Sequence, residues 1–179
     1  MRRNWLLLIG IFLAFTWSCK NIREKLLPSF TVNIPAIKLR IPPLPILSTK
    51  EIPVGALRTP INMDSAIRAN TAGTFGSDAV HSVKVKNIVL TSENADANNN
   101  LSNFESARIR IFDDTSFVDI ATISFPETTT DSLMVIPSSS PNISKYLKSK
   151  TIAYNLYFKN RRITKKPLQL QIQIALSVQ

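Results

Sequence analysis

The chain has 179 residues, of which 44% are hydrophobic, and its formal net charge at pH 7 is +10. One cysteine and one histidine exclude an internal disulfide and a zinc site built from several Cys and His ligands. Only four glycines, together with many β-branched residues, favour a folded and strand-rich chain over a disordered one.

The chain starts with the layout of a bacterial export signal. Arg2 and Arg3 precede an apolar run over residues 5–17, and the small Ser18 comes just before the only cysteine, Cys19. The run is shorter than the roughly 20 apolar residues of a membrane-spanning helix, and it fits the roughly 7–15 of a secretory signal. We therefore predict a signal peptide over residues 1–18, which takes no part in the fold.

Residues 15–19, FTWSC, resemble a lipobox, the segment in which lipoprotein signal peptidase cuts before a lipidated cysteine. The resemblance implies cleavage after Ser18, acyl chains such as palmitate on Cys19, and a lipidated tether over residues 19–27. Lys20 stands where Asp would retain a lipoprotein at the inner membrane, which implies the outer membrane, on either of its sides. An uncleaved signal anchor and simple secretion are the alternatives.

Cleavage before Cys19 would remove two arginines and leave a net charge of +8. Such an excess would indicate nucleic acid as the partner of a cytosolic protein, but the export signal excludes that interpretation. The acidic partners that we expect are membrane headgroups, anionic glycans or an acidic protein surface. The alternative is that the charge only keeps the protein soluble.

Residues 28–179 are expected to form one domain, of a natural size for a single core. Seven of the eleven prolines lie between Pro28 and Pro60, and each proline removes a backbone donor. We therefore predict an extended segment over residues 28–60, with edge strands over residues 30–34 and 38–41. A Pro-rich ligand for a docking domain is the alternative.

The middle of the chain alternates apolar and polar residues. A short helix is predicted over residues 64–69 with Asp64 as its N-cap, and a second one over residues 141–147. Between them the alternation predicts four strands, over residues 81–91, 105–112, 119–125 and 132–136.

The last two runs, over residues 151–159 and 168–178, are predicted to pair as an antiparallel hairpin. In the second run every other residue from Leu168 to Val178 is apolar, and most of the others are glutamine. One face is then buried and the other hydrated, which favours an antiparallel sheet. The fold class predicted is all-β, an antiparallel β-sandwich of about seven strands with one or two short helical turns.

The sequence predicts no catalytic residue, no cofactor and no metal site. His81, the only histidine, has no partners for catalysis and is expected to be structural. A weak calcium candidate consists of Asp96, Asn98 and Glu105, which occupy positions 3, 5 and 12 of a calcium loop counted from Asn94. The surrounding pattern of strands rather than helices argues against it.

A basic group is the strongest candidate for binding. It lies at the predicted hairpin tip and consists of Lys159, Arg161, Arg162, Lys165 and Lys166. These side chains are candidate contacts for phosphate or carboxylate groups. The alternative is a solvated turn whose charges prevent sheet edges from aggregating.

The order of the predicted elements over residues 80–179 resembles that of poorly characterised bacterial lipoproteins with an immunoglobulin-like or similar β-sandwich. The elements are a strand, the Asn-rich loop, a strand with the pattern Ala-x-Ile-x-Ile, a short helix and the final two strands. The resemblance implies a membrane-tethered, non-enzymatic envelope protein with a binding or structural role, and it assigns no functional residue. The alternative is a sandwich that holds a lipid between its sheets. A hydrolytic enzyme, with carboxylates around Asp113 or Glu105, comes third.

Overall fold

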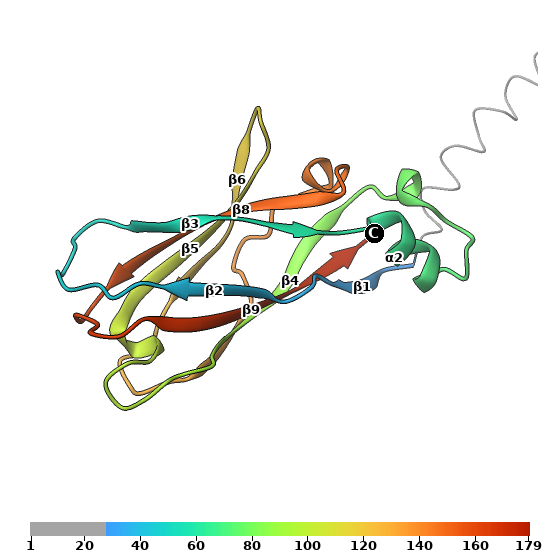
Figure 1. The fold of residues 1–179 in the computed structure, drawn as a ribbon. Helices are drawn as coiled ribbons and strands as arrows, with labels where there is room; N and C mark the ends of the chain where they lie inside the picture. Colours follow the sequence, from blue (N-terminus) through green and yellow to red (C-terminus); the bar gives the residue numbers. More distant parts are fainter. Residues whose placement is uncertain (1–27) are drawn as a thin grey trace, which may run out of the picture.

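The computed structural model describes residues 28–179, which form two antiparallel sheets packed face to face (Figure 1). The predicted signal peptide, Ser18 and Cys19 lie outside the described residues. The described part of the chain holds nine strands and one α-helix, so the predicted all-β sandwich is confirmed, with two strands more than the seven expected. Within the described residues, no helix has the length and apolar character needed to cross a membrane.

The first sheet is built around the C-terminal strand β9. β1 and β2 pair with successive parts of the same edge of β9, with Val32 opposite Leu176 and Leu39 opposite Leu170. Proline lies between these two short strands, so the predicted Pro-interrupted edge strands are confirmed. β4 pairs with the other edge of β9, and β7 pairs with β4. The strands are β1 (Phe30–Asn33), β2 (Ile37–Ile41), β4 (Val83–Ser92), β7 (Ser132–Val135) and β9 (Leu168–Val178).

The second sheet has the order β3-β8-β5-β6. Its edge strand β3 was not predicted, because it carries Pro53 and Pro60 near its ends. Both prolines are tolerated since β3 is paired on one side only. Gly55 lies at a register shift in this strand with a φ of +143°, which residues with a side chain rarely adopt. The strands are β3 (Ile52–Pro60), β5 (Phe104–Phe112), β6 (Phe117–Ser124) and β8 (Thr151–Asn160).

The first short helix begins earlier than predicted. Helix α2 (Met63–Asn70) is capped by Asn62, whose side chain accepts a hydrogen bond from the Ser65 N–H at 2.9 Å. Asp64 is therefore not the N-cap, because it lies inside the first turn and pairs with Arg68 at 2.7 Å. Three 3-10 helices complete the fold: η1 (Ser77–Ala79), η2 (Leu101–Asn103) and η3 (Ser144–Leu147).

The core lies between the two sheets and follows the alternation along the strands. Every other residue of β9 from Leu168 to Val178 is buried, as predicted, while Gln169 and Gln173 are exposed. The aromatic rings of Phe104, Phe125 and Phe158 pack together in the second sheet, with ring centroids 5.1 to 6.4 Å apart. Burial of such alternating faces is the main favourable contribution to folding.

The predicted hairpin between the last two strands is wrong. β8 belongs to the second sheet and β9 to the first, so residues 161–167 cross from one sheet to the other (Figure 1). Seven extended residues can span roughly 23 Å, which exceeds the roughly 10 Å between packed sheets. Alternation within a strand shows which face is buried but not on which side of the core that strand lies, so it could not distinguish the two arrangements.

Candidate functional site

Three loops meet at the end of the sandwich that lies opposite α2 and the C-terminus. They are residues 42–51 between β2 and β3, residues 93–100 after β4, and residues 161–167 between β8 and β9 (Figure 1). We call these three loops the distal end. The described chain begins at the other end, where β1 pairs with the last residues of β9.

Hydrogen bonds join the crossing loop to the loop after β2. The Thr164 N–H donates to the Leu44 carbonyl at 3.0 Å, and the Leu44 N–H donates to the Thr164 hydroxyl at 2.8 Å. The buried Asn160 amide donates to the Ile46 carbonyl at 3.0 Å and accepts from the Ser48 N–H at 3.2 Å. The two loops therefore hold a common backbone arrangement.

The Asn-rich loop is closed by its own side chains. Asp96 accepts a hydrogen bond from the Asn98 N–H at 2.8 Å, and this bond, followed by the Lys166 ammonium, lowers the pKa of Asp96. Asn100, 1% exposed, accepts from the N–H and the hydroxyl of Ser102 at 3.0 and 2.7 Å. Such local bonds are the reason why Asn and Asp gather in turns.

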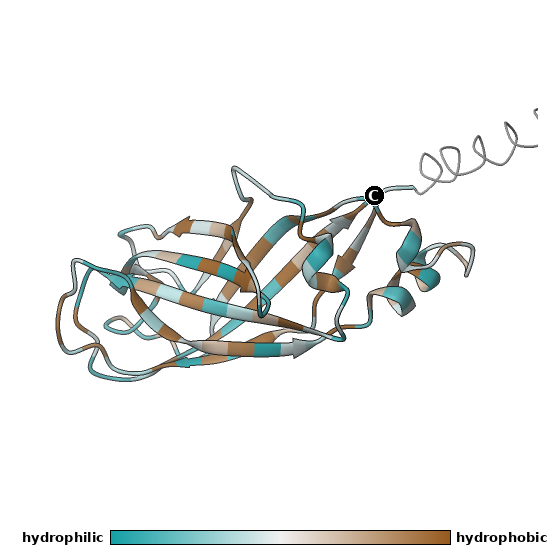
Figure 2. Ribbon diagram, turned by 90° about the horizontal axis from the view of Figure 1, so that it is seen from above, coloured by the Kyte–Doolittle hydropathy of each residue, from teal (hydrophilic) through white to brown (hydrophobic). Residues whose placement is uncertain are grey.

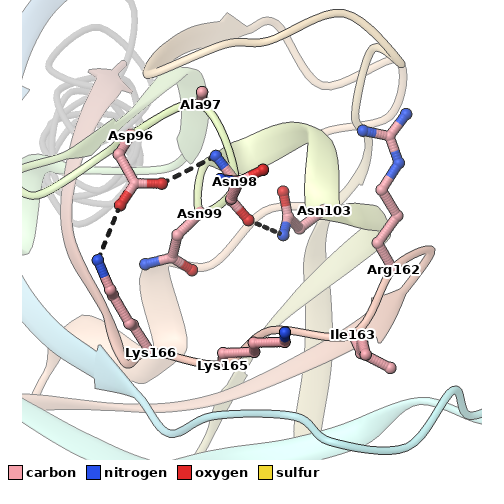
Figure 3. Close-up of a pocket in the computed structure, with 9 residues that line it drawn as sticks. All are labelled: Asp96, Ala97, Asn98, Asn99, Asn103, Arg162, Ile163, Lys165 and Lys166. Atoms are coloured by element: carbon pink, nitrogen blue, oxygen red, sulfur yellow. Dashed lines mark hydrogen bonds and ion pairs between the residues drawn. The ribbon is translucent and has the colours of Figure 1, made fainter.

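A groove of about 640 Å³ lies between the Asn-rich loop and the crossing loop (Figure 3). The loops are held together beside it, because the Asn94 amide donates to the Pro167 carbonyl at 3.0 Å. Asp96 is the one carboxylate among the lining residues, and it pairs with Lys166 at 3.4 Å. The groove is lined by Asp96, Ala97, Asn98, Asn99, Asn103, Arg162, Ile163, Lys165 and Lys166.

One lining residue carries a polar atom without a partner. Asn99 is 3% exposed, and its amide nitrogen donates to the Pro167 carbonyl at 3.3 Å. Within the described residues its Oδ1 accepts no hydrogen bond. A buried acceptor in this state raises the free energy of the folded protein, and a donor that reached it would remove that cost.

The structure brings three members of the predicted basic group to the groove. Arg162 and Lys165 have no carboxylate oxygen within 4.0 Å among residues 28–179, whereas Lys166 pairs with Asp96. The other two members lie elsewhere: Lys159 pairs with Glu105 at 2.7 Å across strands β8 and β5.

Arg161 is turned toward the protein instead. Its guanidinium donates to the carbonyls of Ser102, Phe125 and Pro126 at 3.2, 3.0 and 3.1 Å. The side chain is 23% exposed and lies 4.0 Å from the Glu127 carboxylate. It therefore joins the crossing loop to the end of β6 rather than presenting its charge to a ligand.

The weak calcium candidate is not assembled as a ligand set. Glu105 pairs with Lys159 on β8, while Asp96 is occupied by the Asn98 N–H and by Lys166. Among residues 28–179, no group of three or more His, Cys, Asp or Glu side chains is close enough to hold a metal ion.

The carboxylates that could have served a hydrolytic enzyme have structural partners. Asp113 accepts from the N–H groups of Thr115 and Ser116 at 2.8 and 2.7 Å, and hydrogen bonds led by the Thr115 N–H lower its pKa to about 2. Asp119 pairs with Arg110 at 2.7 Å and with Arg108 at 3.2 Å, and these arginines lower its pKa.

A second groove, of about 700 Å³, lies between α2 and η3 at the other end of the sandwich. Its floor is apolar, with the buried Ile67 and Leu147, and its rim carries Lys148 and Lys150. Asp64 and Asp78 line the same groove. Two carboxylates balance two lysines in this groove, whereas the distal groove has three cations and one carboxylate, so this groove selects less strongly for an anion.

Comparison of the chain with protein-family models, with curated proteins and with solved structures found no match.

Proposed function

We propose that this chain is a membrane-tethered, non-enzymatic envelope lipoprotein that binds an anionic ligand in the groove at its distal end. The observation that carries the proposal is the meeting of two loops that are far apart in the sequence. They place Arg162, Lys165 and Lys166 around one groove with a single carboxylate, that of Asp96.

The charges and amides of the groove suit an anion that also carries hydrogen-bonding groups. Arg162 presents a planar set of N–H donors that matches a carboxylate or phosphate, and Lys165 adds a point charge. The exposed Asn98 offers a further amide group along the opposite wall, whereas the buried Asn103 amide is bonded to the Asn98 carbonyl at 2.9 Å (Figure 3). The formal net charge of +8 that remains after the proposed cleavage attracts anions over a longer range.

The partners of the carboxylates support binding rather than hydrolysis. A general acid or base must be able to reach a substrate, but Asp113 is held by its own turn and Asp119 by two arginines. Asp96 also has its oxygens engaged, by the Asn98 N–H and the Lys166 ammonium.

The proposed tether joins the described domain at the end away from the groove. The export signal and the lipobox-like residues 15–19 support acylation at Cys19. The described domain begins at residue 28, at the end opposite the distal loops (Figure 1). An anchor on Cys19 would thus leave the groove free to meet a ligand.

Mass spectrometry of the N-terminal peptide tests the tether. We expect the chain to begin at Cys19 and to carry the added mass of acyl chains, and Cys19→Ser to leave the leader uncut. An unmodified Cys19 or an intact leader in the wild-type protein would refute the lipoprotein proposal.

Binding of a soluble polyanion, polygalacturonate, by the full-length protein in neutral detergent tests the groove. The double variant R162Q/K165Q should lower the affinity about tenfold or more, because two unpaired cations are lost from one site. The control R58Q/K84Q removes one exposed arginine and one exposed lysine from other faces of the domain. Equal losses for both double variants would mean that overall charge, not the groove, determines binding.

A further inference from the structure

Three large aliphatic side chains are exposed together at the distal end. Ile46 is 76% exposed, Leu47 is 58% exposed and Ile163 is 48% exposed. The remaining exposed large hydrophobic residues of the described chain lie on strand β6 or on β7 and the residue after it: Phe117, Met134 and Ile136. Arg110 covers the Phe117 ring at 3.9 Å from its centroid.

The backbone holds these three side chains in one place. The Asn160 side-chain amide donates to the carbonyls of Ile46 and Arg162, at 3.0 and 3.3 Å. Because Leu47 follows Ile46 and Ile163 follows Arg162, one side chain fixes the backbone of both loops beside the exposed residues. The pair of hydrogen bonds between Thr164 and Leu44 brackets the same region. Figure 2 shows apolar residues, in brown, within the loops at this end.

Cations without a carboxylate partner lie close to the aliphatic residues in the same two loops. Arg162 and Lys165 flank Ile163 in the sequence, and Lys50 follows Leu47 in the same loop. The nearby carboxylates are neutralised inside the protein, since Glu51 pairs with Arg108 and Asp96 with Lys166. Among residues 28–179, Lys50, Arg162 and Lys165 make no salt bridge within 4.0 Å.

The loop that carries Ile46 and Leu47 has little freedom to lose on binding. Pro42, Pro43 and Pro45 fix three of its φ angles, and its backbone is already bonded to the crossing loop. Ordering such a loop against a partner costs less conformational entropy than ordering a flexible one. The exposed side chains of Ile46 and Leu47 can therefore contact a partner without a further ordering of the loop backbone.

The combination of exposed aliphatic groups and unpaired cations favours an anionic bilayer over a soluble anionic glycan as the partner. A soluble anionic glycan can pair with the cations but offers no apolar phase for Ile46, Leu47 and Ile163. A bilayer with anionic headgroups offers both, because aliphatic side chains enter the boundary between headgroups and acyl chains while Lys and Arg attract the negative surface.

We propose that the distal end docks on an anionic phospholipid surface, with Ile46, Leu47 and Ile163 inserted at the interface and Arg162, Lys165 and Lys50 against the headgroups. This inference rests on the proposed function, because it names the ligand class of the same basic surface. The groove residues then hold a headgroup, while the aliphatic group supplies the contact that a soluble anion would not need.

The experiment uses full-length protein held by its own N-terminal segment in phosphatidylcholine nanodiscs and captured by a tag at the C-terminus, which lies away from the distal end. Vesicles of phosphatidylcholine, vesicles that also contain phosphatidylglycerol, and soluble polygalacturonate are passed over separate samples. The first variant is I46S/L47S/I163S. Its control is I136S, a comparable exposed isoleucine that is 75% exposed next to β7.

Wild-type protein should bind the phosphatidylglycerol vesicles well above the phosphatidylcholine vesicles. The triple serine variant should lose about tenfold or more of that affinity, because each buried methylene contributes to insertion. The double variant I46S/L47S keeps the groove-lining Ile163. It should lose part of the affinity for the phosphatidylglycerol vesicles but bind polygalacturonate as the wild type does, and I136S should match the wild type throughout. R162Q/K165Q should lose affinity for both anionic probes.

The outcomes separate the two proposals. If the triple serine variant binds phosphatidylglycerol vesicles as well as the wild type does, membrane docking is refuted while the anion site survives. The same follows if the wild-type protein binds polygalacturonate but does not distinguish the two kinds of vesicle. If neither anionic probe binds, the proposed function fails together with the inference. Far-UV circular dichroism on each variant shows whether a loss reflects unfolding instead.

Discussion

Replacing Arg161 by methionine tests whether this side chain stabilises the fold or serves a ligand. The substitution keeps an unbranched side chain of similar reach but removes every donor. It leaves the carbonyls of Ser102, Phe125 and Pro126 without the guanidinium that now lies 3.0 to 3.2 Å from them. The backbone bond from the Arg161 N–H to the Asn103 carbonyl, at 2.8 Å, is not affected.

The expected fall in the free energy of unfolding is smaller than the summed contributions of the three hydrogen bonds. A hydrogen bond to a charged group contributes about 1.5–3 kcal/mol, so three such bonds would give an upper bound of about 5–9 kcal/mol. Arg161 is 23% exposed, and water can replace the guanidinium at some of the carbonyls. We therefore expect the free energy of unfolding to fall by about 2–3 kcal/mol, which lowers the Tm of a domain of this size by about 5–10 °C.

Urea and thermal unfolding of the full-length protein in neutral detergent, followed by circular dichroism, measures this loss. The matched control is Arg162→Met, because Arg162 is the next residue, is exposed, and makes no salt bridge among the described residues. The control should change the free energy of unfolding by less than about 0.5 kcal/mol. Equal effects of the two substitutions, or an unchanged midpoint for Arg161→Met, would refute the role that we assign to Arg161.

Three further predictions concern single side chains of the described domain. In urea unfolding, Tyr154→Phe should leave the free energy of unfolding unchanged or raise it by up to about 1 kcal/mol, because the buried Tyr154 hydroxyl has no hydrogen-bond partner. A clear fall in the free energy of unfolding would contradict this and indicate that the hydroxyl makes a hydrogen bond. Asn100→Ala should lower the free energy of unfolding by about 1–3 kcal/mol by the same measurement, because the Ser102 N–H loses its acceptor, while the exposed Asn98→Ala should not. NMR titration should find a pKa of about 2 for Asp113 in the folded protein, lowered from 3.8. The stabilising effect of the Asp113 carboxylate is therefore complete above about pH 4 and is lost as the pH falls through 2, and Asp113→Asn should remove this pH dependence of the free energy of unfolding.

The interior of the sandwich was largely predictable from local patterns. Alternating residues of β5 and β9 face the core as the sequence indicates, because a strand repeats every two residues and its apolar face must be buried. Proline in residues 28–60 correctly predicted edge strands. The same prolines are the reason why β3 was not predicted, since a strand with proline near its ends and one unpaired edge is difficult to distinguish from an extended loop.

The candidate site was predicted in separate pieces. The sequence indicates a basic segment over residues 159–166 and an Asn-rich loop, but nothing in either segment indicates that they line one groove. The pattern also could not show that Arg161 turns inward while Arg162 does not, because both lie in an irregular loop without periodicity. The exposed group of Ile46, Leu47 and Ile163 carried no sequence signal, since each residue alone resembles a core residue.

By itself, the sequence determined the strand-rich character of this protein, the buried face of its regular strands and the basic charge of its loops. Each of these follows from residue types and their spacing over a few positions. Only the tertiary structure decided that β8 and β9 lie in opposite sheets and that residues 93–100 meet residues 161–167. The physical reason is that alternation gives a strand a buried face without giving it a neighbour, and the neighbours are chosen by packing across the whole core.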